Sequence, residues 1–256
     1  MSTENSPEQP AFFDGPNGRL AYRETTHGTA DRATIVWLGG FRSDMDGTKA
    51  AHLHQWAQDN GHGYLRFDYS GHGLSDGVFA DGAISDWASD ARAIVHARCA
   101  GKTILVGSSM GAWIALLLAR AAPEKLAGLV LLAPAPDFTS ALMWPSLTDA
   151  ERAAIERDGR LEKPSDYDEA PTILTRRLFE NGAKSRVLDQ PISIPAPVRI
   201  LQGMADLDVP YGHALKTAET IRADDLVLTL TKSGDHRLST DQDLARLTAT
   251  LEGIID

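Results

Sequence analysis

Short runs of β-branched and other apolar residues alternate, along most of the chain, with longer segments whose apolar residues recur at helical spacing. The short runs predict buried strands, and the longer segments predict amphipathic helices. The predicted strands are "ATIVWLGG", "GYLRF", "KTILVGSS", "LAGLVLLAP", "PVRILQG" and "DLVLTL". The predicted helices are "TKAAHLHQWAQDNG", "ISDWASDARAIVHARC", "MGAWIALLLARAAP", "YGHALKTAETI" and "DQDLARLTATLEGII". This order is typical of βαβ units, so we predict an α/β fold, with a mostly parallel sheet covered by helices on both faces.

Two segments depart from the alternation. At the start, "AFFDGPNGRLAYRE" places a Gly-Pro-Asn-Gly turn between two apolar runs and predicts an antiparallel hairpin. Between Pro134 and Pro197 the chain is richer in Pro, Asp, Glu and Arg, and we expect helices over "LTDAERAAIERDG" and "APTILTRRLFENG" but no strand. Because the alternation resumes afterwards, we predict one domain over residues 1–256, with a helical cap inserted at about residues 137–190.

Composition narrows the classes of partner. A net charge of -10 without any run of Lys or Arg argues against a nucleic acid or an anionic membrane as the partner. The single cysteine, Cys99, excludes an internal disulfide framework and a cysteine-based zinc site, and we expect it to be buried packing. No apolar stretch reaches the length of about 18 residues that a membrane span needs. The first residues, "MSTENSPEQPAFF", have neither an apolar core nor Arg or Lys, so we expect no targeting peptide and a cytoplasmic protein.

A G-x-S-x-G motif lies where a predicted strand meets a predicted helix. In "GSSMG", residues 107–111, Ser109 occupies the central position, whereas Ser108 is flanked at the corresponding positions by Val106 and Met110. Glycines on either side of the serine allow a sharp strand-to-helix turn that presents the hydroxyl at a helix N-terminus. Ser109 is therefore the candidate nucleophile, and the alternative is a glycine-rich turn whose serine has no chemical role.

A serine hydroxyl needs a base, which in this arrangement is a histidine that follows an acidic residue in the chain. Of the eight histidines, only His213 and His236 come after Ser109. His213 falls in a predicted helix, whereas His236 lies in the polar loop "TKSGDHRLS" after the last predicted strand. For the acid, "QGMADLDVP" offers Asp206 and Asp208; we favour Asp206, at the first turn off its strand, with Asp208 as a cap of the next helix.

Attack on a carbonyl also needs donors for the developing negative charge on oxygen. The Met110 amide, directly after the serine, is one candidate. The other is the Phe41 amide, in the loop that follows the strand "TIVWL", where Gly39 and Gly40 permit close approach. We predict an oxyanion hole formed by these two amides, and the alternative is an ordinary turn at a strand end.

The stretches "WLGGF", "RFDYSGHGLSDG", "GSSMGAW", "QGMADLDVP" and "GDHRLS" together resemble the α/β-hydrolase family over nearly the whole chain. The acid of the family's G-x-x-D-x-x-V-P pattern falls on Asp206. "GGFRSDMDGTKA", "FDYSGHGLSDG" and "GSSMG" are most similar to the acyl-glucuronide esterase and palmitoyl-protein thioesterase group and its bacterial relatives. The resemblance implies a serine esterase or thioesterase with the Ser-Asp-His triad, a small-molecule ester or thioester substrate, and no cofactor or metal. The mammalian relative is mitochondrial, whereas we expect no mitochondrial targeting signal in this chain.

Candidate residues for substrate binding come from the loop after the first parallel strand and from the cap. Arg42, or Arg237 beside the histidine, is expected to favour anionic substrates such as acyl glucuronides. The remaining candidates for an acyl pocket, which could equally be the core of the cap, are Met143, Trp144, Leu178 and Phe179.

Two alternatives from other functional classes remain open. A ligand-binding protein could use the same scaffold without catalysis, and an acyltransferase or cofactor-free haloperoxidase could use the same three residues. The sequence argues against a dinucleotide site, because Gly71 and Gly73 are followed by Asp76 where the G-x-G-x-x-G pattern needs a glycine. His52 and His54, two residues apart on a predicted helix, face nearly opposite ways and are not expected to share a metal.

Overall fold

An eight-stranded sheet, of strand order β1-β2-β4-β3-β5-β6-β10-β12, runs through the protein. The computed structural model describes residues 9–26, 32–164 and 171–255, so part of the stretch inspected for a targeting signal, residues 1–8, lies outside the described residues. The sheet strands are β1 (Ala11–Gly15), β2 (Gly18–Thr25), β3 (Thr34–Leu38), β4 (Tyr64–Phe67), β5 (Thr103–Ser108), β6 (Leu126–Leu132), β10 (Val198–Gly203) and β12 (Leu226–Thr231). β2 pairs antiparallel with β1 and β4, and the other pairs are parallel. The predicted α/β fold, with its N-terminal hairpin, is confirmed.

Helices cover both faces of this sheet. They are α1 (Thr48–Asp59), α2 (Ile84–Arg98), α3 (Met110–Ala121), α7 (Tyr211–Thr220) and α8 (Asp241–Glu252). Alternate residues of each strand enter different apolar clusters, as the period of two dictates. Leu105 and Leu129 join the cluster that holds α2, α3 and α7, whereas Val106 and Val130 join the one that holds α1 and α8. Among the described residues, no helix is both long and apolar enough to span a bilayer.

The parallel register places several loops at one edge of the sheet. Leu38 lies opposite Gly107, and Ser108 lies opposite Leu132, so β3, β5 and β6 end side by side. Gly203 lies opposite Thr231, which brings the ends of β10 and β12 to the same edge. The loops that carry the candidate residues therefore start from neighbouring strand ends, where ligands bind in open α/β sheets.

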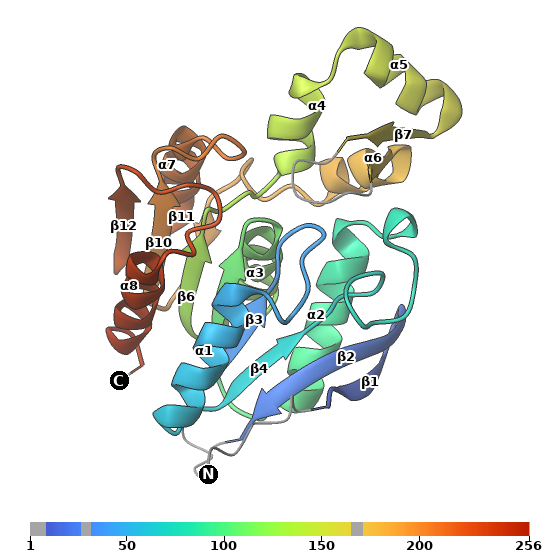
Figure 1. Cartoon of the computed structure of the whole chain (residues 1–256). Coiled ribbons are helices and arrows are strands. Elements are labelled where there is room, and N and C mark those ends of the chain that lie inside the picture. The colour runs from blue at the N-terminus through green and yellow to red at the C-terminus, as the bar shows by residue number, and fades with distance from the viewer. Residues whose placement is uncertain (1–8, 27–31, 165–170, 256) are drawn as a thin grey trace.

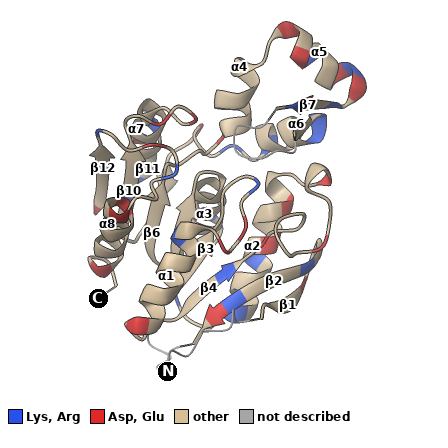
Figure 2. Cartoon of the chain, in the orientation of Figure 1, with Lys and Arg blue, Asp and Glu red and all other residues tan. Residues whose placement is uncertain are grey.

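The chain between β6 and β10 forms its own group of elements above this edge (Figure 1). The elements above the edge are η3 (Thr139–Met143, a π-helix), α4 (Trp144–Ser146), α5 (Asp149–Asp158), β7 (Arg160–Lys163), β8 (Thr172–Thr175) and α6 (Arg176–Lys184). The chain then returns to the start of β10, where β9 (Ile192–Ser193) pairs with β11 (Ile221–Arg222). Two short 3-10 helices lie elsewhere, η1 (Phe79–Asp81) and η2 (Pro123–Lys125). Lys/Arg and Asp/Glu are interspersed over the insertion and the sheet-bearing part alike (Figure 2).

The expectation of helices without strands between Pro134 and Pro197 was wrong, because β7, β8 and β9 all lie there, and β8 replaces part of an expected helix. Residues 172–175, "TILT", form β8 and pair antiparallel with β7 instead of starting a helix. Two threonines and an isoleucine in four residues favour extended backbone. The hydroxyl of Thr175 accepts a hydrogen bond from the Leu178 amide at 3.1 Å, so the helix begins only after this cap.

Candidate active site

Ser109 occupies a strained turn between β5 and α3. Its φ is 54° and its ψ is -115°, a combination that residues with a side chain rarely adopt. Two backbone contacts fix this conformation: the Ser109 amide donates to the Leu132 carbonyl at 2.9 Å, and the Ala135 amide donates to the Ser109 carbonyl at 3.2 Å. The neighbouring strand β6 therefore stabilises a turn that would be unfavourable in an isolated chain.

The two glycines of the motif are required by close backbone contacts. A Cβ atom on Gly107 would lie 2.4 Å from the Gly111 carbonyl oxygen. A Cβ atom on Gly111 would lie 1.9 Å from the Leu38 carbonyl oxygen, at the end of β3. The spacing of the motif is thus explained by the packing of the elbow against itself and against β3.

The structure brings Ser109, His236 and Asp206 together in one hydrogen-bonded chain. His236 Nε2 lies 3.1 Å from Ser109 Oγ, and His236 Nδ1 lies 2.8 Å from Asp206 Oδ2. The side chain of His236 is 20% exposed and that of Asp206 is fully buried. The imidazole therefore lies at the edge of the site, whereas the carboxylate behind it is shielded from water.

Asp206 is held as a carboxylate by several donors. Its Oδ1 accepts from the amides of Asp208 and Val209, at 2.9 and 2.8 Å, and its Oδ2 accepts from Gln202 Nε2 at 3.1 Å as well as from His236. Burial by itself raises the pKa of Asp206, but the hydrogen bonds from His236 and the Val209 amide outweigh it and hold the pKa below its ordinary value. A charged Asp206 selects the tautomer with hydrogen on Nδ1, which leaves Nε2 free to accept the Ser109 proton.

Asp208, the alternative acid, contributes its backbone amide to Asp206. Its expected role as a helix cap was wrong, because α7 has Pro210 at the N-cap without a side-chain hydrogen bond. Asp206, Asp208 and His236 each offer one possible metal ligand, within 4.8 Å of one another. Both ring nitrogens of His236 are already engaged by Ser109 and Asp206, so the arrangement fits proton transfer better than metal ligation.

The loop that carries His236 is fixed from two sides. The Ala205 amide donates to the Gly234 carbonyl at 3.0 Å, which joins the loops of the acid and the histidine. On the other side, Lys49 at the start of α1 reaches across to donate to the Arg237 carbonyl, next to His236. Burial lowers the pKa of Lys49 to about 8, with partial compensation from Asp235. Sequence reasoning missed Lys49, for which the only signal is its place shortly after the loop of Phe41.

The loop after β3 lies directly against the serine. A Cβ atom on Gly40 would be 3.5 Å from the Cβ of Ser109, so the backbone before Phe41 faces the elbow. The Phe41 ring packs against Phe79, Trp87 and Phe138, with ring centroids 4.9, 6.0 and 5.5 Å away. These contacts anchor the loop beside Ser109, and Met110 begins α3 on the other side.

Asp68 fastens the same loop to its neighbour. Its two carboxylate oxygens accept from the amides of Met45 and Leu74, at 2.6 and 2.8 Å, and so join the loop after β3 to the loop after β4. Burial raises the pKa of Asp68 to about 6 despite these two amides. The "SGHGLSDG" stretch, which Leu74 belongs to, thus supports the loop beside the serine.

Comparisons with known proteins identify the family of this chain. A family model described as "Serine aminopeptidase, S33" matches residues 29–160. The mitochondrial palmitoyl-protein thioesterase ABHD10 of Homo sapiens is 34% identical over 223 residues, which cover 87% of this chain and 72% of that protein. The chain belongs to the α/β-hydrolase family. Because the relatives carry "mitochondrial" in their name, the cytoplasmic location stays a prediction.

Solved structures resemble this α/β-hydrolase over almost its full length. A presumed hydrolase from Agrobacterium vitis S4 matches with a TM-score of 0.93 and 46% identity, over 97% of this chain and 99% of that one. The alpha/beta hydrolase domain-containing protein 10 from mouse matches with a TM-score of 0.88 and 33% identity, over 97% and 98% of the two chains. The resemblance therefore includes the inserted segment.

The expected substrate residues of this α/β-hydrolase lie in or against the insertion. The Trp144 and Phe179 rings meet edge to face, 4.9 Å apart, and Leu178 and Phe179 are buried. Met143 is half-buried against the same apolar cluster. The Arg42 guanidinium donates to Thr172 Oγ1 at 2.6 Å and so connects the loop of Phe41 to β8. Their role toward a substrate stays a prediction, and Leu178 and Phe179 also serve the core of the insertion.

Proposed function

We propose that this α/β-hydrolase cleaves carboxylic esters or thioesters through an acyl-enzyme intermediate on Ser109. The observation that carries the proposal is the unbroken chain of hydrogen bonds from Ser109 through His236 to the buried carboxylate of Asp206. Such a chain turns a weak hydroxyl nucleophile into one that attacks a carbonyl at neutral pH.

In the first step, Ser109 Oγ forms a bond to the carbonyl carbon while its proton moves to His236 Nε2. The carbonyl oxygen becomes an oxyanion, which we place between the amides of Phe41 and Met110, at the positive N-terminal end of α3. The tetrahedral intermediate then collapses, and His236 gives its proton to the departing alcohol or thiol. The acyl group remains on Ser109.

In the second step, water repeats the sequence. His236 accepts a proton as the water oxygen attacks the acyl carbon, and it returns that proton to Ser109 Oγ as the carboxylic acid leaves. Asp206 stabilises the imidazolium that forms in each step and keeps the ring in one orientation, because its own oxygens are fixed by the amides of Asp208 and Val209.

We also propose that the segment at about residues 137–190 is the cap that selects the acyl group. Both of its ends are joined at Asp137, whose carboxylate accepts from the amides of Val187 and Leu188, at 2.8 and 3.0 Å. The segment starts from the strand next to β5 and so lies over the edge that carries Ser109. The relatives named palmitoyl-protein thioesterase support long acyl thioesters as the substrates to test first.

The test is a panel of p-nitrophenyl esters and acyl thioesters of graded chain length, with and without a glucuronate leaving group. Ser109→Ala is expected to reduce kcat/KM by at least about 10⁴-fold, because no other group replaces the nucleophile. Ser108→Ala, one residue away at the buried end of β5, is the matched control and is expected to stay within about tenfold of the parent enzyme. Turnover that persists in folded Ser109→Ala protein contradicts the proposal.

A further inference from the structure

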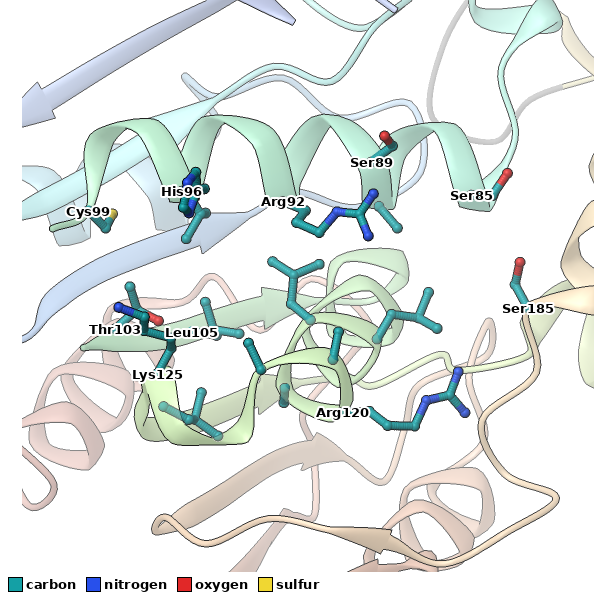
Figure 3. Close-up of a pocket in the computed structure, with 18 of the residues that line it drawn as sticks. Ser85, Ser89, Arg92, His96, Cys99, Thr103, Leu105, Arg120, Lys125 and Ser185 are labelled. Carbon is teal, nitrogen blue, oxygen red and sulfur yellow. The ribbon is translucent and has the colours of Figure 1, made fainter. Parts of the chain in front are cut away.

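A groove of about 610 Å³ runs between α2 and α3 (Figure 3). This volume lies within the range of sites that hold small organic ligands. Ser109, Asp206 and His236 do not line it, so it is separate from the candidate active site. Its occupant is therefore a question independent of the hydrolytic chemistry.

The floor of the groove is apolar. Its side chains come from both helices and from the two strands beneath them, and they include Ala88, Val95, Leu105, Leu117, Leu118 and Leu126. Cys99 closes one end, and burial raises the pKa of its thiol to about 12, so this end is also uncharged at neutral pH. Such a floor suits a hydrocarbon chain.

The rim of the groove is positively charged, whereas the protein as a whole has a negative net charge. Four permanently basic side chains line the groove, and in the described ranges it has no acidic lining residue, although the chain has 35 Asp and Glu against 25 Lys and Arg. The four are Arg92, Arg120, Lys125 and Lys184. The rim is therefore positively charged on a protein whose net charge is -10.

Within the described part of the chain, these four cations also differ from many other basic residues in forming no ion pair. Arg98 and Arg177, for example, pair with Glu24 and Asp86. Over the residues that the structure describes, no ion pair includes any of the four rim cations. The positive charge of the rim is therefore open to an anion from solution.

The view along the groove shows where such an anion fits. Arg92 projects from α2 and Arg120 from the opposite wall, both toward the end at which Ser85 and Ser185 lie (Figure 3). Two guanidinium groups with nearby hydroxyls are suited to a carboxylate, which Arg binds through paired N–H donors. The apolar floor continues from there toward Cys99.

We propose that this groove is an accessory binding site for a fatty carboxylate, an anionic head with a long alkyl tail. The head binds between Arg92 and Arg120, and the tail lies along the floor toward Cys99. The site includes Lys184, the last residue of α6 in the insertion, and Ser185 directly after it. The Ser185 carbonyl accepts a hydrogen bond from Trp113 Nε1 at 3.1 Å. A bound molecule thus contacts α2, α3 and the insertion together and is expected to raise the melting temperature.

The test measures dodecanoate binding by calorimetry to Ser109→Ala protein, in which the proposed chemistry is removed. Two ligands isolate the parts of the molecule: acetate has the head without the tail, and dodecyltrimethylammonium has a similar tail with a cationic head. We expect dodecanoate to bind at least about tenfold more tightly than either, because both charge and tail contribute.

A double substitution, Arg92→Gln with Arg120→Gln, distinguishes binding in the groove from binding under the cap. It is expected to weaken dodecanoate binding at least about tenfold and to abolish the rise in melting temperature, whereas the exposed Lys216→Gln is expected to leave both unchanged. Unchanged affinity in the double variant, or equal affinity for the cationic amphiphile, overturns the proposal. Ester turnover is measured separately, so failure of the proposed hydrolysis leaves this result interpretable.

Discussion

Asp206→Asn tests the role of the buried acid, because it replaces one carboxylate oxygen by an NH₂ group with almost no change in side-chain size. In the parent protein Oδ1 faces two amide donors, from Asp208 and Val209, so the new carbonyl oxygen is expected to take that position. The new NH₂ group then takes the position of Oδ2, where it faces His236 Nδ1 and Gln202 Nε2. A donor now meets the ring nitrogen, so His236 changes to the tautomer that has its hydrogen on Nε2.

This tautomer cannot accept a proton from Ser109. The same replacement in the well-studied serine protease triad lowers kcat by about 10⁴-fold through the wrong tautomer. At about 1.4 kcal/mol for each tenfold change, the expected loss is about 5.5 kcal/mol of transition-state stabilisation. Because the same two contacts occur here, from Ser109 to His236 and from His236 to Asp206, we expect a loss of that order in kcat, with KM nearly unchanged.

The assay is the pH dependence of p-nitrophenyl ester hydrolysis at saturating and limiting substrate, with a thermal melt to confirm folding. Asp208→Asn is the matched control, because its amide, which the substitution keeps, is the group that contacts Asp206. The control is expected to stay within about tenfold of the parent enzyme. Folded Asp206→Asn protein that also stays within about tenfold would refute the assignment of Asp206 as the orienting acid.

Two other substitutions probe the elbow and the loop of the histidine, and Gly212→Ala in α7 is a control. Gly111→Ala places a Cβ atom 1.9 Å from the Leu38 carbonyl oxygen and is expected to lower the melting temperature strongly. The control Gly212→Ala, whose Cβ meets nothing within 4 Å, is expected to leave the melting temperature equal or slightly higher. Equal melting temperatures for the two variants would contradict the packing argument. Lys49→Met removes the donor to the Arg237 carbonyl and is expected to lower kcat about tenfold with little change in KM, a split that an unchanged kcat would disprove. Burial lowers the pKa of Lys49 from 10.5 to about 8, so between these pH values the unfolded state binds more protons than the folded state. In denaturant titrations, the free energy of unfolding of the parent protein, relative to that of Lys49→Met, should therefore rise with pH across this window. A difference that does not change with pH would show that Lys49 is not buried as described.

The sequence predicted the alternating sheet and the elbow because both depend on local patterns. Apolar runs such as "TILVGS" are buried on both faces of the sheet, and the glycines beside Ser109 are required by contacts within a few ångströms. The strand β8 was missed because a four-residue run before a helical pattern has the same apolar spacing as a helix. Local sequence patterns therefore predict the sheet and the elbow around Ser109 better than they predict the structure of the insertion.

The supporting contacts of the site could not be read from the chain because they join distant segments. Lys49 and Arg237 meet only when α1 and the loop after β12 are packed together. The preference for Asp206 over Asp208 came from its place just after a strand, and the structure adds the reason, which is that the Asp208 amide supports the Asp206 carboxylate. Long-range hydrogen bonds of this kind need the fold before they can be recognised.

The central claim is that Ser109, and no other hydroxyl, is made nucleophilic by His236. Labelling with a fluorophosphonate, followed by intact mass and peptide mapping, tests it most directly, because the probe bonds only to an activated serine. We expect one adduct per chain, on the peptide that holds Ser109. The adduct should be absent in Ser109→Ala and should form at least about 10³-fold more slowly in His236→Ala. An adduct on Ser108 or on another peptide, or equal labelling rates with and without His236, would contradict it.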